Sequence, residues 1–192
     1  AAVIRLPHIS NFTDFMPLEQ HELLGVRYVQ RARELGRPDL VILPGTKNTM
    51  EDLLWLRQNG LEAAALKLAH AGTPILGVCG GYQMLGQTLD DPQGTESGRP
   101  MALSGLGLLP TRTVFDAQKR RMQVRAAAQG ELFGGARLTG YEIHNGRTEV
   151  GGAPFCVLED GTPEGCVNRN VFGTYLHGLF DSGELTGALK LN

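Results

Sequence analysis

The residues with the clearest capacity for chemistry lie in one short segment, Gly77-Val78-Cys79-Gly80-Gly81. An apolar run over 74–78 leads into it and a helical pattern follows, which places Cys79 at a sharp strand-to-helix turn. Flanking glycines suit such a turn, because side chains there would clash with the strand and the helix. The N-terminus of the following helix favours a thiolate and offers N–H groups to an oxyanion. We therefore predict a nucleophilic Cys79; the alternative is a small buried cysteine at a Gly-rich strand end.

A cysteine nucleophile needs a general base, which is most often a histidine. The run over 171–176 reads as a strand that ends at His177, and catalytic side chains of open α/β sheets gather at strand ends. His21 and His70 have polar, helical surroundings and are predicted to lie on the surface. The residues alone leave two interpretations of His177 open: a general base, or a histidine bonded to a backbone carbonyl. The chain has five histidines: His8, His21, His70, His144 and His177.

Two Gly-containing segments do not fit phosphate-binding motifs. In Gly45-Thr46-Lys47 a threonine separates the glycine from the lysine, and the earlier glycine of a Walker A loop is missing. The segment 105–110 ends in Pro110 where a dinucleotide fingerprint has glycine. The cysteines Cys79, Cys156 and Cys166 form no C-x-x-C pair, so neither a disulfide framework nor a zinc site is expected. We predict no nucleotide site and no metal site, and structural roles for Cys156 and Cys166.

The elements that must position Cys79 and His177 form an alternating pattern. Strands are predicted over 2–6, 26–29, 40–43 and 74–78, and helices from a capping box at Thr49-x-x-Asp52 onward, over 61–71 and over 82–89. A turn-rich stretch follows at 90–98. This order predicts a mostly parallel sheet with helices on both faces. The strands predicted over 111–115, 123–127, 140–144, 156–159 and 171–176 would add an antiparallel extension, and 183–192 reads as a helix that is cut short.

Composition excludes several classes of protein. The 192 residues are 42% hydrophobic and 20% charged, which is typical of a soluble globular protein, and the length fits a single domain over 1–192. The formal net charge of −2 argues against a nucleic-acid partner. No apolar run is long enough to cross a membrane, and no secretory signal is visible, so we expect a cytoplasmic protein. Because the chain does not begin with Met, we expect a fragment or processed form of a longer protein.

The segment Cys79-Gly80-Gly81-Tyr82-Gln83 resembles the nucleophile motif of class I (triad-type) glutamine amidotransferases. More narrowly, the chain resembles the C-terminal glutaminase domain of the cobyric acid synthases. The supporting segments occur in that family's order and span nearly the whole chain: 9–15, 43–49, 77–86, 105–109, 140–144 and 173–178. The resemblance implies a class I glutamine amidotransferase-like, flavodoxin-like fold with a mixed, mostly parallel sheet.

The resemblance also implies a reaction. Cys79 would attack the side-chain amide of glutamine to give a γ-glutamyl thioester and ammonia, and His177 would move the proton. The N–H groups of Gly80 and of the Gly45–Thr46 turn would stabilise the oxyanion. We favour a structural or substrate-lining role for His144 over that of a second base. The residues expected to bind the substrate are Gly45, Thr46, Gly80, Gln83, Tyr141 and His144.

The chain departs from the general triad pattern at one position. Typical triad enzymes carry a Glu two residues after the histidine to orient the imidazole, and here that position is Leu179. The cobyric acid synthase branch also lacks this Glu, which supports the narrower resemblance. The third member of the triad is left open among Glu142, Asp181 and Glu184.

In the resembled family an N-terminal synthetase domain uses ATP and Mg²⁺ to activate corrin carboxylates, which ammonia then amidates. The reaction converts adenosylcobyrinic acid a,c-diamide to cobyric acid. We expect this synthetase domain of the same polypeptide, glutamine and a corrinoid as partners, no cofactor within the present domain, and no contact with nucleic acid or membrane. Three alternatives stay open: the glutaminase subunit of an enzyme that amidates peptidoglycan lipid II, the less similar a,c-diamide synthase, and an inactive binding domain of the same fold.

Overall fold

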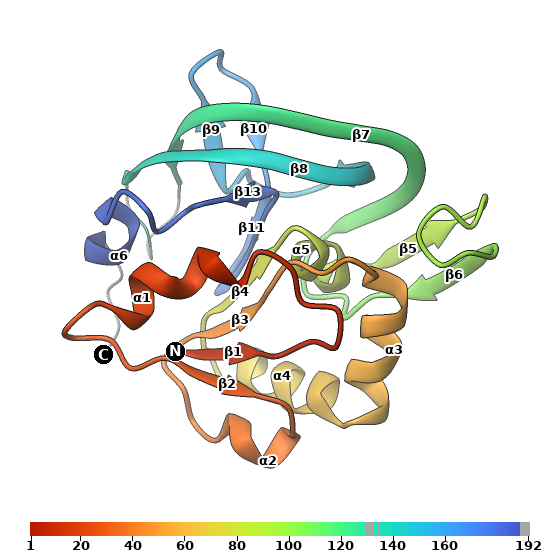
Figure 1. Cartoon of the computed structure of the whole chain (residues 1–192), viewed down its shortest axis with the longest axis horizontal. Coiled ribbons are helices and arrows are strands. Elements are labelled where there is room, and N and C mark those ends of the chain that lie inside the picture. The colour runs from red at the N-terminus through yellow and green to blue at the C-terminus, as the bar shows by residue number, and fades with distance from the viewer. Residues whose placement is uncertain (130–132, 134, 189–192) are drawn as a thin grey trace.

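The structure, a computed structural model, describes residues 1–129, 133 and 135–188, with side chains for all of these except 118–121 and 188. Two sheets organise this part of the chain (Figure 1). The helical elements are η1 (Phe12–Phe15), α1 (Met16–Glu19), α2 (Ala32–Leu35), α3 (Thr49–Gln58), α4 (Leu61–His70), α5 (Gly80–Leu85) and α6 (Glu184–Ala188).

The first sheet has the strand order β11-β12-β4-β3-β1-β2. Neighbouring strands in it are parallel, except for β11, which pairs with β12 in the antiparallel sense. Parallel strands with helical connections have their side chains buried on both faces, which explains why β1, β3, β4 and β12 are continuously apolar or small. Its strands are β1 (Ala2–Ile4), β2 (Arg27–Val29), β3 (Val41–Leu43), β4 (Ile75–Val78), β11 (Cys166–Asn168) and β12 (Val171–Thr174).

The second sheet is mainly antiparallel and centres on two long strands, β7 and β8. Figure 1 shows this pair running across the molecule above the end of the first sheet. The short β13 pairs with β8, so the segment that follows β12 passes from the first sheet to the second. Its strands are β5 (Thr88–Asp91), β6 (Met101–Ser104), β7 (Thr111–Ala128), β8 (Arg137–Val150), β9 (Cys156–Leu158), β10 (Pro163–Glu164) and β13 (Leu176–His177).

The hydrophobic core divides into two clusters, one on each face of the first sheet. Alternating side chains of a strand point to opposite faces, and Val41 and Leu43 lie in one cluster whereas Ile42 lies in the other. The first cluster includes buried residues of α2, α3, α4 and α5. The second is formed with η1, α1, α6 and the inner side of β7, β8 and β9. One face of the sheet is therefore covered by helices and the other largely by the second sheet.

The predicted α/β class with a mostly parallel sheet is confirmed, and the antiparallel strands form a sheet of their own. The first four predicted strands and the helix over 61–71 are present with ends shifted by one or two residues. The helix predicted from a Thr49 cap is capped by Asn48 instead, whose side chain accepts a hydrogen bond from Glu51 N at 3.1 Å. Of the helix predicted over 183–192, residues 184–188 are helical and 189–192 lie outside the described residues.

Three sequence-based boundaries were wrong. The helix predicted over 82–89 begins at Gly80 and ends at Leu85, and the next segment is strand β5, which pairs with both β6 and β7. The strands predicted over 111–115 and 123–127 are one continuous strand, because β8 pairs with β7 on both sides of a register shift between Val114 and Lys119. The strand predicted over 171–176 is interrupted at Tyr175, where the chain changes sheets.

Among the described residues, no helix combines the length and the apolar character needed to cross a membrane.

Candidate active site

Cys79 occupies the turn between β4 and α5. Its φ of 51° and ψ of −111° lie in a region that a residue with a side chain rarely adopts. The helix starts at the next residue, so the Gly80 N–H belongs to the first turn of α5, where N–H groups have no helical acceptor. The conformation aims the thiol away from the sheet and toward β8, where Cys79 Sγ lies 3.3 Å from the carbonyl oxygen of Ile143.

The glycines around Cys79 are required by the close approach of neighbouring backbone and side-chain atoms. A Cβ atom on Gly77 would lie 2.8 Å from the carbonyl carbon of Gly81, and one on Gly81 would lie 2.0 Å from the carbonyl oxygen of Leu43. A Cβ atom on Gly80 would lie 2.6 Å from Thr46 Cγ2. The turn therefore fits only without side chains at these three positions, and it brings the start of α5 directly against the 45–46 turn.

His177 ends β13 and is almost completely buried. Its Nδ1 lies 2.7 Å from Asp14 Oδ2, and the other carboxylate oxygen of Asp14 accepts a hydrogen bond from Gly178 N at 3.2 Å. Asp14 is itself buried on η1. A buried carboxylate that accepts from Nδ1–H fixes the tautomer and leaves Nε2 for the reacting group.

The thiol and the imidazole come together next to Gly45. A Cβ atom added there would lie 3.2 Å from His177 Cε1 and 3.6 Å from Cys79 Cβ. Burial lowers the pKa of His177, but hydrogen bonds and charge from Asp14 and Cys79 outweigh burial and raise this pKa to about 9. A histidine with this pKa favours holding the thiol proton, which leaves sulfur as the nucleophile.

Gly45 and Thr46 follow β3 and form the wall of the site opposite Gly80. The Thr46 hydroxyl donates to Asp52 Oδ2 at 2.5 Å, and Asp52, fully buried on α3, also contacts His8 Nδ1 at 2.7 Å. The backbone of the 45–46 turn is thereby fixed beside the nucleophile. A Cβ atom on Gly80 would lie 3.3 Å from Thr46 N, so the backbones of the two residues lie close together beside Cys79.

A cavity of about 450 Å³ opens over Cys79 and His177. Thr46, Gln83 and His144 also line it, so the structure brings these sequence-predicted residues together. Tyr141 does not line this cavity. It stacks on the His177 ring with the ring centroids 5.3 Å apart and an interplanar angle of 23°, so it contacts the expected base instead of the space for substrate.

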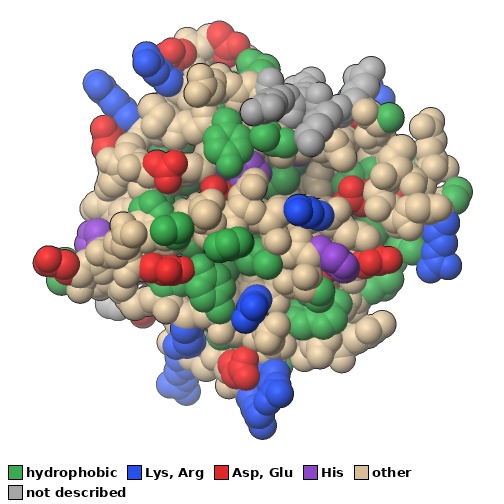
Figure 2. Space-filling view, in the orientation of Figure 1, with side chains coloured by type: hydrophobic (Ala, Val, Ile, Leu, Met, Phe, Trp, Pro, Cys, Tyr) green, Lys and Arg blue, Asp and Glu red, His purple; other side chains and the backbone are tan. Residues whose placement is uncertain are grey.

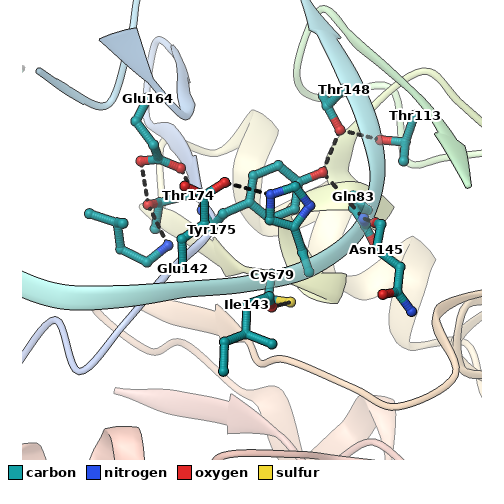
Figure 3. Close-up of polar contacts among 12 residues, drawn as sticks. Cys79, Gln83, Thr113, Glu142, Ile143, Asn145, Thr148, Glu164, Thr174 and Tyr175 are labelled. Atoms are coloured by element: carbon teal, nitrogen blue, oxygen red, sulfur yellow. Dashed lines mark hydrogen bonds and ion pairs between the residues drawn. The ribbon is translucent and has the colours of Figure 1, made fainter. Parts of the chain in front are cut away.

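Gln83 is held by contacts from three parts of the chain. Its side-chain oxygen accepts from Thr49 Oγ1 at 3.2 Å. Its nitrogen donates to the Asn145 carbonyl at 3.1 Å and to Tyr175 Oη at 3.2 Å (Figure 3). The Tyr175 hydroxyl is in turn bonded to Thr148, which contacts Thr113 at 2.8 Å. This chain of hydrogen bonds fixes the amide of Gln83 at the cavity wall.

His144 forms a buried pair with Glu142. His144 Nε2 lies 2.5 Å from Glu142 Oε1, and the imidazole stacks on the Tyr175 ring with centroids 3.6 Å apart. Its Nδ1 has no hydrogen-bond partner among the described residues. The pair orients the imidazole along the wall of the cavity.

Glu164 supports the segment that leads to His177. It is deeply buried, and it accepts hydrogen bonds from Tyr175 N at 2.6 Å and from Thr174 Oγ1 at 2.7 Å. The Thr174 hydroxyl also accepts from Leu176 N at 3.1 Å (Figure 3). Burial raises the pKa of Glu164 although these donors oppose the shift. The carboxyl group thus satisfies the backbone where the chain leaves β12 for β13.

The orienting carboxylate was missed at the sequence level. Glu142 pairs with His144, and Glu184 accepts from Arg137 N at 2.9 Å. Asp181 lies beside Gly178, and the carboxylate that contacts the imidazole is that of Asp14. Asp14 was available as a signal, because it is the acidic residue within the 9–15 segment that carried part of the family resemblance. Nothing local connects this segment to His177.

Other side chains at the candidate site were also missed. Ser10 and Asn11 line the cavity, and the Asn11 amide lies 3.2 Å from His177 Nδ1. Thr49 and Tyr175 act on Gln83 as described above. These residues come from three separate parts of the chain, and no spacing in the sequence indicates their contacts. Among the described residues, no group of three or more His, Cys, Asp or Glu side chains is arranged to hold a metal ion.

Comparison with known proteins gives a consistent result. A family model described as the CobB/CobQ-like glutamine amidotransferase domain matches residues 1–185. The cobyric acid synthase of Ruminiclostridium cellulolyticum is 47% identical over 96% of this chain and 38% of its own length. That of Desulforudis audaxviator is 49% identical over 94% of this chain and 37% of its own length. The chain thus spans well under half the length of these curated relatives.

Solved structures show the same fold at low sequence identity. A chain in the structure of PurLQS from Thermotoga maritima superposes with a TM-score of 0.72 at 18% identity, covering 97% of this chain and 95% of that one. A protein solved as a glutamine amidotransferase gives a TM-score of 0.67 at 16% identity, with coverages of 97% and 94%. At these identities the likeness is one of fold.

Proposed function

Because the chain belongs to the family of CobB/CobQ-like glutamine amidotransferase domains, we propose that Cys79, His177 and Asp14 form its glutamine-hydrolysing triad. The observation that carries this proposal is the buried Asp14–His177 pair next to a cysteine in a strained strand-to-helix turn. A thiol, a base with a raised pKa and an orienting carboxylate are the three parts that such a nucleophilic site requires.

In the proposed reaction the Cys79 sulfur attacks the side-chain carbonyl carbon of glutamine, and the carbonyl oxygen becomes an oxyanion between the N–H groups of Gly80 and Thr46. His177 Nε2 gives its proton to the amide nitrogen, the C–N bond breaks, and ammonia leaves a γ-glutamyl thioester. Water then attacks the thioester carbon, His177 accepts a proton from this water, and the C–S bond breaks to release glutamate. The sum is glutamine and water converted to glutamate and ammonia.

Substrate binding is assigned to the walls of the 450 Å³ cavity. Gln83, with its amide fixed by Thr49 and Tyr175, would hold the bound glutamine together with Gly45 and the 45–46 turn. His144 would close the cavity at the β8 side. Tyr141 would act on the base by stacking on His177 rather than by touching substrate.

The acceptor of the ammonia is proposed from the curated relatives, which are cobyric acid synthases. In this proposal the domain works within a longer polypeptide whose synthetase part uses ATP and Mg²⁺ to activate corrinoid carboxylates for amidation. The present domain needs no cofactor of its own for the thiol chemistry. We assign the reaction to the cytoplasm, whose reducing conditions keep a thiol nucleophile such as Cys79 free.

The test is glutamate release from glutamine by the full-length polypeptide that contains this domain, with Cys79→Ala and His177→Ala alongside. Glutamate release by the wild type and its loss in both variants is the expected result. The electrophile 6-diazo-5-oxo-norleucine should add covalently to Cys79 in the wild type. Wild-type protein that neither releases glutamate nor takes up the label in the presence of ATP, Mg²⁺ and corrinoid would overturn the proposal.

A further inference from the structure

The short helix that holds Asp14 has a second, outward side. Asp14 and Phe15 point inward and are buried, whereas Phe12 is 57% exposed and Met16, at the start of α1, is 44% exposed. Figure 2 shows hydrophobic side chains gathered in the middle of the face on which η1, α1 and β2 lie. Large apolar side chains clustered at the surface mark an interaction site more often than single exposed ones do.

These side chains line a groove of about 550 Å³. We call it the η1 groove and define it by its lining residues, which are Arg5, Ile9, Phe12, Met16, Glu19 and Tyr28. Its two charged residues differ in their pairing. Glu19 accepts a hydrogen bond from Tyr28 Oη at 2.5 Å, whereas the Arg5 guanidinium has no carboxylate partner within the part of the chain that the structure describes. The groove thus offers an apolar floor and an unused positive charge.

The groove and the active-site cavity lie on two sides of the same segment. Ser10 and Asn11 line the cavity, while Ile9 and Phe12 line the groove. A protein surface that occupied the groove would therefore border the site at which ammonia is released. A module that consumes this ammonia benefits from lying next to the cavity, since ammonia that escapes into water is diluted and protonated.

We propose that the η1 groove docks the synthetase part of the longer polypeptide, through an apolar side chain with a neighbouring carboxylate that faces Arg5. The inference rests on the proposed function, which gives the ammonia a consumer. The curated relatives support it, because more than half of their length lies outside the region matched by this chain. Apolar contact with a matching charge is the usual composition of such an intramolecular interface.

Docking at this groove would act directly on the triad. η1 is only four residues long and begins after Asn11, whose backbone is left-handed with a φ of 51°. A partner packed on Phe12 and Met16 would fix η1 and so hold Asp14 at its 2.7 Å contact with His177. Glutamine hydrolysis would then be fastest when the synthetase part is docked. Asp14 acts here as a positioning residue that links the interface to the base.

The test uses the full-length polypeptide with the double substitution Phe12→Ser and Met16→Ser, and separately Arg5→Glu, which leaves the apolar surface unchanged. Val114→Ser is the matched control, because Val114 is 43% exposed but lies on β7 and lines no part of the groove. Corrinoid amidation is measured with glutamine and then with ammonium chloride as the nitrogen source. Glutamate release is measured with and without ATP, Mg²⁺ and the corrinoid.

The groove variants are expected to lose at least about tenfold in glutamine-dependent amidation while amidation from ammonium chloride is retained. The increase of glutamate release by ATP and corrinoid should be lost at the same time, and Val114→Ser should behave like the wild type. If the groove variants match Val114→Ser in all three assays, the docking proposal is wrong, whereas the proposed glutamine hydrolysis is unaffected. A wild type that amidates no corrinoid even from ammonium chloride would overturn the proposed acceptor, and the docking proposal with it.

Discussion

Asp14 Oδ2 and His177 Nδ1 lie 2.7 Å apart although 163 positions separate the two residues in the chain. The contact joins a short helix near the N-terminus to the last strand of the second sheet. The carboxylate that orients the imidazole therefore comes from a distant segment of the chain. It does not come from position 179, two residues after the histidine, which is a leucine. The site is therefore complete only when both ends of the described chain are folded together.

Asp14→Asn should lower kcat for glutamine hydrolysis by about 10²-fold or more, because an amide no longer fixes the Nδ1–H tautomer or stabilises the imidazolium. Asp181→Asn is the matched control, since Asp181 lies beside Gly178 whereas the carboxylate that contacts the imidazole is that of Asp14. Steady-state glutamate release by both variants measures the difference. Equal activities in the two variants would contradict the assignment of Asp14.

The protonation of His177 should follow its raised pKa. Imidazole NMR of the folded wild type should show a titration midpoint near pH 9, and Asp14→Asn should move this midpoint to lower pH because one of the groups that raise the pKa is removed. A midpoint that is the same in both proteins would contradict the role of the carboxylate.

The raised pKa of His177 also makes the free energy of unfolding depend on pH. Because the pKa of His177 is higher in the folded state than in the unfolded state, its contribution to the free energy of unfolding is complete below about pH 6.5 and is lost as pH rises through about 9. Urea unfolding at about pH 6 and about pH 10 should therefore show a larger loss for wild type than for Asp14→Asn. A loss of the same size in both proteins would argue against this linkage.

Gly81→Ala should destabilise the fold by about 3 kcal/mol or more, since the new methyl group would overlap the Leu43 carbonyl oxygen, 2.0 Å away, and neither backbone can yield easily. Gly25→Ala serves as the control, because nothing lies within 4 Å of a Cβ atom there. Chemical denaturation gives both free energies. Should Gly81→Ala unfold at the wild-type midpoint, the close approach of α5 to β3 would be wrong.

Tyr175→Phe should raise KM for glutamine about fivefold, equivalent to about 1 kcal/mol, with little change in kcat. The hydroxyl is the partner of the Gln83 amide and holds it at the cavity wall. Tyr82→Phe is a matched control, because the Tyr82 hydroxyl is buried without a hydrogen-bond partner among the described residues. A KM that is unchanged in Tyr175→Phe would remove Gln83 from the substrate-binding proposal or show that its other contacts suffice.

Local signals in the sequence indicated the proposed nucleophile but not the groups that surround it. Cys79 could be predicted because its turn is built from neighbours: an apolar strand before it and glycines where Leu43 and Thr46 approach. Asp14 and Tyr175 could not, since their contacts depend on how distant segments pack. The strand β5 was missed for a similar reason. Its four residues become a strand through pairing with β6 and β7, which lie beyond the turn-rich stretch that follows it.

The register of the first sheet also explains what could be inferred about His177. β12 pairs with β4 so that Thr174 lies opposite Val78, one residue before the nucleophile. A strand that ends in a histidine was recognisable, but its place next to β4 was not, because β4 could have paired with any other parallel strand. The break at Tyr175, which turns the chain toward β8, depends on the buried Glu164 and has no local signature.

The order of these segments along the chain has a consequence during synthesis on the ribosome. β4 and Cys79 emerge well before β12 and His177, so the nascent chain has a thiol without its base and a β4 strand with one edge unpaired. Such an edge is a site for mispairing with other chains. When residues 171–177 are synthesised, β12 pairs with the free edge of β4 and His177 reaches the thiol. A product terminated before these residues would therefore lack the proposed base and would be prone to aggregate.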